Sequence, residues 1–228
     1  PLLIIFFWFI FTYTGKVPPT SLPSLSAVKD TFIEMLKSGQ LSNDLSLSLR
    51  RVLAGFFISS VLGISLGIFM GISSKAKEFF QLTLTAIRQI PMIAWIPLII
   101  LWAGIGEVSK IVVILFAATF PIVVNTMGGV DSTSETYLEV AKMYGLSKKD
   151  TFFKVYLPSA LPNIFTGLRL GLGASWMAVV ASELIASSSG IGYRLNDARS
   201  LMRSDVVIVC MIIIGLVGLL MDKLIVLI

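Results

Sequence analysis

The sequence predicts an all-α, polytopic membrane protein with six transmembrane helices in a single domain, residues 1–228. Composition is the first observation: 56% of the 228 residues are hydrophobic and 14% are charged, and the mean hydropathy is +0.91, outside the range of ordinary soluble domains. The second is a succession of long apolar runs separated by short polar segments. The third is a set of small residues at a spacing of four inside those runs, which is typical of packed membrane helices.

The chain begins with the apolar residues 2–13, a run too short for a span of about 20 residues. Because Pro1 and not Met stands first, we interpret this run as part of a truncated first helix. A signal peptide is the alternative, although no basic segment or cleavage pattern is visible.

A short amphipathic helix at the membrane surface is expected next, ending before Gly39; docking of a partner on this helix is the alternative. The residues that share its apolar face are Val28, Phe32, Met35 and Leu36.

The second span (residues 52–72) and the fifth span (161–187, opening with Pro162) each carry a stripe of small residues. In the second span these are Gly55, Ser59, Gly63, Gly67 and Gly71, and in the fifth they are Gly167, Gly171 and Ser175. Lipid tails are as apolar as leucine, so membrane helices associate by close packing, which small residues permit. Both stripes are therefore predicted to be helix-packing surfaces.

Residues that could line a translocation pathway lie in the third span (79–103), the fourth (108–128, which also holds Pro121) and the fifth. They are Arg88, Pro91, Trp95, Asn125, Trp176 and Glu183. Proline bends a helix and frees carbonyl groups, as Pro91 and Pro97 would in the third span. Ionisable side chains inside a span are expensive and often functional. The alternatives are that Arg88 extends to the interface and that Glu183 lies near the outer surface.

The polar segment 188–205 precedes the sixth span, which begins at Val206. Its mixed charges indicate a solvated face or, alternatively, a surface that meets an external partner. Basic residues are scattered among the apolar segments along the chain, so no nucleic-acid surface is predicted.

Several kinds of chemistry are excluded by residue counts. The chain has no histidine and one cysteine, Cys210, which rules out disulfides within the chain, Cys/His zinc sites and histidine-dependent acid–base catalysis. No metal site is expected. There is no phosphate-binding P-loop either, so any nucleotide must be hydrolysed by another subunit.

Two short helices joined by a turn are predicted in the polar stretch 139–158. Periodic residues extend to Tyr144, Gly145 ends the first helix, and Ser147 with Asp150 forms a capping box for the second.

The same stretch resembles the cytoplasmic EAA loop of ABC importer permeases. The match consists of Glu139-Val140-Ala141, three residues, Gly145, nine residues, Val155, one residue and Leu157-Pro158. Further stretches resemble the sulfonate, nitrate and taurine branch of these permeases: SLRRVLAGF from Ser48, IPMIAWIPLIILWAGIGE from Ile90 and GLRLGLGASW from Gly167.

The resemblance implies a type I importer fold in the plasma membrane of a prokaryote. It also implies partners: two cytoplasmic ABC ATPase subunits, which bind ATP and Mg, a second permease subunit that forms a homodimer, an external substrate-binding protein and membrane lipid. Residues 131–160 would form the cytoplasmic coupling loop. The positive-inside rule does not select this orientation, because the inner loops hold fewer Lys and Arg residues than the outer ones.

Coupling to the ATPase is expected to use Tyr137, Glu139, Ala141, Tyr144, Gly145, Leu146 and Pro158. The first loop helix would enter a groove in the ATPase. Glu139 would cap or pair at the interface, Ala141 would keep the docking face thin, Gly145 would make the turn and Pro158 would end the second helix.

The resemblance favours a small anion such as a sulfonate, taurine or nitrate as substrate. A vitamin or pyrimidine precursor is the alternative. An ATPase-independent secondary transporter and an intramembrane enzyme are weaker alternatives, because the spans offer few paired charges and no nucleophile–base arrangement.

Overall fold

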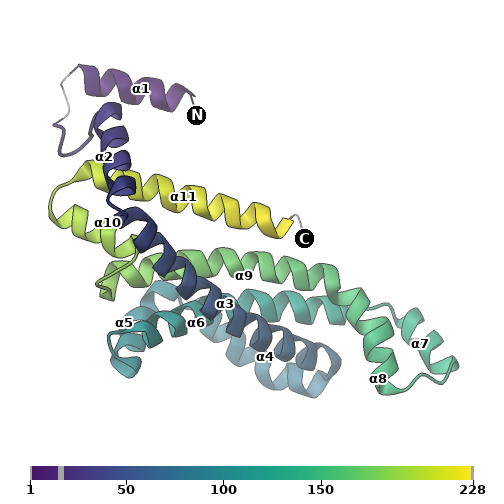
Figure 1. Cartoon of the computed structure of the whole chain (residues 1–228). Helices are drawn as coiled ribbons and strands as arrows, with labels where there is room; N and C mark the ends of the chain where they lie inside the picture. Colours follow the sequence, from purple (N-terminus) through teal and green to yellow (C-terminus); the bar gives the residue numbers. More distant parts are fainter. Residues whose placement is uncertain (1, 15–17, 227–228) are drawn as a thin grey trace.

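In the computed structural model, which describes residues 2–14 and 18–226, all regular secondary structure is helical (Figure 1). The elements are α1 (Leu2–Tyr13), α2 (Leu25–Lys37), α3 (Gln40–Ile72), α4 (Ser74–Gln89), α5 (Met92–Ala103), α6 (Glu107–Asp131), α7 (Glu135–Met143), α8 (Lys148–Thr151), the π-helical turn η1 (Phe152–Tyr156), α9 (Leu157–Ala186), α10 (Ile191–Ser200) and α11 (Ser204–Val226). Figure 1 shows α7 and α8 projecting from one end of the bundle, the loop end, and α2 and α10 at the other, the far end.

Within the residues that the structure describes, four helices are long and apolar enough to cross a membrane: α3, α6, α11 and the continuous helix made by α8, η1 and α9. The pair α4 and α5 adds a fifth if its two bent halves count as one span. The predicted first span corresponds to α1, whose 12 residues fall short of this length. The chain is thus a multi-pass membrane protein.

The small residues of α3 pack against α6, as predicted. Gly55, Gly63, Gly67 and Gly71 face Ile114, Ile122, Thr126 and Val130 in turn. Because the number of the facing residue rises with that of the glycine, α3 and α6 run in the same direction. A methyl group at any of these glycines would lie 2.5–2.7 Å from the facing side chain, which is closer than atoms can approach.

Helix α9 packs on α6 in the opposite direction through its own small residues. Gly171 faces Ile122 and Ala118, whereas Gly167 faces Ile122 and Asn125. This confirms the packing predicted for the fifth span. Helix α6 is therefore the centre of the bundle, with α3 and α9 fixed against it.

The third predicted span, residues 79–103, is not a single kinked helix. Helices α4 and α5 meet at 99°. Ile90 has φ −79° and ψ 120°, an extended conformation, because the ring of Pro91 disfavours a helical conformation in the preceding residue. Pro97 lies inside α5 without ending it. The sharp change of direction brings the end of α4 against the middle of α6.

The predicted surface helix and second span are both present, but their boundary differs from expectation. Helix α2 begins with Ser24, whose side chain accepts a hydrogen bond from the amide of Ala27 (3.2 Å). Gly39, with φ +74°, joins α2 directly to α3. Helix α3 therefore starts well before residue 52, and its polar first turns extend to the far end of the bundle.

Candidate functional site

The projecting loop has the two-helix geometry that its sequence predicts. Helix α7 closes with hydrogen bonds from the amide of Leu146 to the carbonyl of Ala141 and from the amide of Gly145 to that of Lys142, both 3.0 Å. Gly145 has φ +65°, the left-handed conformation that glycine adopts at helix ends. The hydroxyl of Ser147 then accepts a hydrogen bond from the amide of Asp150 (3.1 Å) and caps α8.

Pro158 does not end the second loop helix, contrary to the expectation. The helix continues through η1 into α9, and Lys148–Ala186 is one helix of 39 residues. Proline lacks an amide hydrogen and its ring crowds the preceding turn. The π-helical turn, in which the amide of Leu157 bonds to the carbonyl of Phe152, widens the helix just before Pro158 and accommodates the ring.

The coupling residues divide between an outward surface and the inside of the loop. Tyr137, Tyr144 and the neighbouring Met143 are 63%, 82% and 85% exposed, whereas Ala141 is 3% exposed. The small side chain of Ala141 therefore lets α7 approach the second loop helix, and it does not thin the outward face as expected. Glu139 is also exposed, but it lies two residues from Tyr137 and therefore on the opposite side of α7.

A cavity of about 560 Å³ opens beside this surface. Five of the predicted coupling residues line it: Tyr137, Ala141, Tyr144, Leu146 and Pro158. Tyrosine and other large side chains in such number at the tip of a loop are typical of a protein–protein contact.

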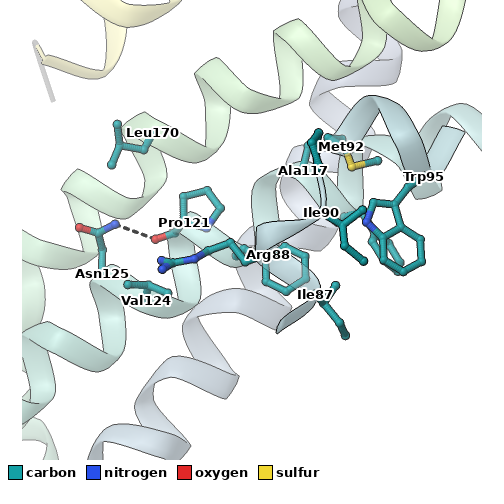
Figure 2. Close-up of a pocket in the computed structure, with 13 residues that line it drawn as sticks. Ile87, Arg88, Ile90, Met92, Trp95, Ala117, Pro121, Val124, Asn125 and Leu170 are labelled. Atoms are coloured by element: carbon teal, nitrogen blue, oxygen red, sulfur yellow. Dashed lines mark hydrogen bonds between the residues drawn. The ribbon is translucent and has the colours of Figure 1, made fainter. Parts of the chain in front are cut away.

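A second cavity, of about 350 Å³, lies where α4, α5 and α6 meet. Arg88, Pro91, Trp95 and Asn125 all line it, so four of the six predicted pathway residues come together. Figure 2 shows the Arg88 side chain extending beneath Pro121 toward Val124 and Asn125, with Trp95 on the other side. The amide nitrogen of Asn125 donates a hydrogen bond to the carbonyl of Pro121 (2.7 Å), which fixes that side chain at the cavity wall.

Trp176 does not line this cavity. It is 4% exposed, and its indole nitrogen donates a hydrogen bond to the carbonyl of Ile214 in α11 (2.9 Å). Its place between α9 and α11 indicates a packing role, because the ring fills the core and the only polar atom is satisfied.

Glu183 also lies away from the cavity, in a buried charge cluster at the far end. Its carboxylate accepts hydrogen bonds from Arg51 Nη1 (2.7 Å), from the hydroxyl of Ser48 (2.8 Å) and from the amide of Gly192 (2.9 Å). An unpaired carboxylate would be costly in this place, and these donors replace water. The structure therefore places Glu183 outside the cavity that four other predicted pathway residues line, where it fastens α9 to α3.

Arg51 is the residue that the sequence did not single out. All five of its N–H groups are used: two bonds go to Glu107, one to Glu183 and two to Ser189. The only sequence signal was a pair of arginines, Arg50 and Arg51, at the start of an apolar run. Among the described residues, no group of three or more His, Cys, Asp or Glu side chains could hold a metal ion.

Comparisons with known proteins agree with this architecture. Residues 59–228 match the family model described as "Binding-protein-dependent transport system inner membrane component". The chain is 41% identical over 210 residues to a putative ABC transporter permease protein of Methanocaldococcus jannaschii, covering 90% of this chain and 79% of the relative.

Two further relatives have named substrates. The putative aliphatic sulfonates transport permease protein SsuC of Bacillus subtilis is 38% identical over 223 residues, covering 98% of this chain and 81% of the relative. The nitrate import permease protein NrtB of a Synechocystis species is 39% identical over 176 residues, covering 77% of this chain and 64% of the relative.

The fold is similar to that of one chain in a crystal structure of an amino acid ABC transporter with histidines. The TM-score is 0.69 at 17% identity, with 86% of this chain and 96% of that chain covered.

Proposed function

The chain belongs to the family of binding-protein-dependent transport system inner membrane components and is the permease of an ABC importer. From this membership we propose that it carries a small oxyanion across the plasma membrane of a prokaryote. An aliphatic sulfonate is the proposed substrate within that class. The names of the sulfonate and nitrate relatives support this class of substrate. Membership of the family leaves no role for the ATPase-independent alternative.

The observation that carries the mechanism is the unbroken helix from Lys148 to Ala186. It begins inside the projecting loop and ends at the far end of the bundle, packed along α6 through Gly167 and Gly171. A force applied to α7 is transmitted to α9 without an intervening flexible linker. Rigid elements packed in this way move as bodies, which is what alternating access requires.

The loop would contact the cytoplasmic ATPase through the outward surface of α7. Tyr137 and Tyr144 provide exposed aromatic area on one side of α7, and Glu139 on the opposite side provides a carboxylate for a basic partner. Gly145 sets the angle between α7 and the long helix. Two ATPase subunits would hydrolyse ATP with Mg on behalf of two copies of this permease, and an external binding protein would deliver the substrate at the far end.

The test is ATP-dependent uptake by the complete transporter in proteoliposomes. The permease would be produced with its ATPase and binding protein, and labelled ethanesulfonate, taurine, nitrate and a neutral vitamin precursor would be offered in turn. We expect uptake of at least one of these anions that needs both ATP and the binding protein. Uptake of a neutral vitamin precursor instead would overturn the substrate class and leave the importer function intact.

A further inference from the structure

Arg88 is a cation without a partner inside a membrane segment. The exposed side chain of Arg88 makes neither a hydrogen bond nor an ion pair within residues 2–14 and 18–226, whereas the buried Arg51 and the partly buried Arg194 are paired. A charged side chain in a span is costly unless it meets water or an opposite charge. Since the described part of the chain supplies no counter-charge, Arg88 is left to water or to an anion from outside the chain.

The surroundings of Arg88 are polar along one side of α4. Gln81, Thr85 and Arg88 recur at helical spacing and are all exposed, whereas Phe79, on another face, is apolar and 75% exposed. An apolar exposed face suits lipid. The polar stripe does not, because lipid cannot hydrogen-bond to it, so it faces a water-filled space.

Arg88 separates two cavities of that space. Arg88, Phe120 and Val124 line both the cavity of about 350 Å³ and a smaller one of about 150 Å³. The larger cavity includes Pro91 and Trp95 from the far-end side of Arg88. The smaller cavity includes Gln81 and Thr85, which lie earlier on α4 and nearer the loop end.

We propose that Arg88 is the point at which the permease selects its substrate by charge, pairing with the anionic head of the solute as it passes from the larger cavity to the smaller one. The oxyanion class rests on the proposed function, whereas the position of the anion step rests on this geometry. A guanidinium offers paired donors that match the oxygens of a sulfonate or nitrate.

The affinity of Arg88 for an anion suits transient binding during transport and not tight retention. Arg88 is exposed to the cavity and, among the residues that the structure describes, is the one cationic side chain that lines either space. A single contact in a watery space is weak, on the order of 1 kcal/mol for charges about 4 Å apart. Transport needs binding that is favourable enough for entry and weak enough for exit. A deeper, fully paired site such as the one around Glu183 would hold an ion too firmly.

Thiol labelling tests the electrostatic claim without knowledge of the substrate. Cys210, the only cysteine of the chain, is fully buried, so an added thiol is the reactive one of the permease, and labelling is read on the permease band alone. Thr85→Cys in the smaller cavity and Met92→Cys in the larger one would each be treated with two methanethiosulfonate reagents, one bearing a sulfonate and the other a trimethylammonium group. The protein used is the complete transporter in proteoliposomes.

We expect the sulfonate reagent to react faster than the cationic reagent at both positions, once each rate is normalised to its reaction with a free thiol. Arg88→Gln should lower that preference by about fivefold, the ratio corresponding to one charge contact in a watery cavity. Arg88→Lys should retain it. The control is Ser42→Cys, exposed at the far end on α3, where Arg88→Gln should leave the ratio unchanged.

ATP-dependent uptake of solute is the second measurement that tests the proposal. Arg88→Gln should reduce ATP-dependent uptake of ethanesulfonate about fivefold, while Arg50→Gln, which removes an exposed arginine from α3, should not. Labelling ratios that are unaffected by Arg88→Gln would overturn the inference and leave the importer function standing. An anion preference at Arg88 in a transporter that carries a neutral solute would instead overturn the proposed substrate class.

Discussion

Arg51 Nη1 lies 2.7 Å from Glu183 Oε1, and the two side chains are 4% and 0% exposed. The pair joins α3 to α9 at the end of the bundle opposite the loop. Arg51 also holds the α9–α10 turn through the carbonyl (2.9 Å) and hydroxyl (2.9 Å) of Ser189. The far end is thus held by charge and hydrogen bonds, whereas the middle of the bundle is held by close packing of small residues.

Removing the cation from this pair should destabilise the protein strongly. Arg51→Met leaves the carboxylate of Glu183 buried without its charge partner, and breaking a buried pair in this way costs roughly 3–5 kcal/mol. The measurement is the thermal unfolding midpoint of the purified permease in detergent. Arg50→Met, next to it but exposed, is the control and should change little. Equal midpoints for the two variants would show that the pair does not contribute.

Gly190 should be irreplaceable for two separate reasons. Its φ is +106°, and a Cβ there would collide with the carboxylate of Glu183. Gly39 has φ +74° but open space around it, so Gly39→Ala costs only the backbone strain of about 1–2 kcal/mol. Gly190→Ala should lower the unfolding midpoint by clearly more than Gly39→Ala. Similar decreases of the unfolding midpoint in the two variants would mean that the charge cluster around Glu183 rearranges to accommodate the added methyl group.

The packing surface between α3 and α6 gives a prediction about stability, and a second glycine of the same protein serves as the control. Gly63→Ala places a methyl group 2.7 Å from Ile122, and overpacking of this kind costs typically about 1–3 kcal/mol. Gly128→Ala, on α6, meets no atom within 4 Å and should be neutral or slightly stabilising, because alanine favours helix. The unfolding midpoint of Gly63→Ala should therefore be lower than that of Gly128→Ala. Equal midpoints would show that α3 and α6 can move apart to accommodate the added methyl group.

Features that depend on local sequence could be predicted from it. The stripe from Gly55 to Gly71 identified a packing face because small residues at a spacing of four have few other uses in a membrane helix. Gly145 and Ser147 identified the turn in the loop, since left-handed glycine and a capping hydroxyl act on their immediate neighbours. Four of the six pathway residues also proved to be neighbours in space.

Features that depend on distant partners could not be predicted. Arg51 and Glu183 are 132 residues apart, and no periodicity indicates which buried charge meets which. Pro91 predicted a bend but not its angle of 99°, because the direction of α5 is set by packing on α6 and α9. Pro158 misled because a π-helical turn, which has no clear sequence signature, lets the helix continue.

Gly145 should be required for coupling and dispensable for folding. A Cβ at Gly145 meets no atom within 4 Å, so the side chain of Gly145→Leu starts in open space. The substitution strains the left-handed backbone (φ +65°) and favours a different turn. The direction of α7 relative to the long helix would then change. We expect normal amounts of protein in the membrane and at least about a tenfold loss of uptake, since misplacing a contact by about 1 Å can cost a hundredfold.

Gly39→Leu carries a similar backbone strain (φ +74°) in open space outside the loop and serves as the matched control. If Gly39→Leu and Gly145→Leu impair uptake equally, the loss comes from destabilisation and the loop is not a lever. If only Gly145→Leu impairs it while the protein remains folded, the angle set by this one residue is what transmits the work of the ATPase to α9.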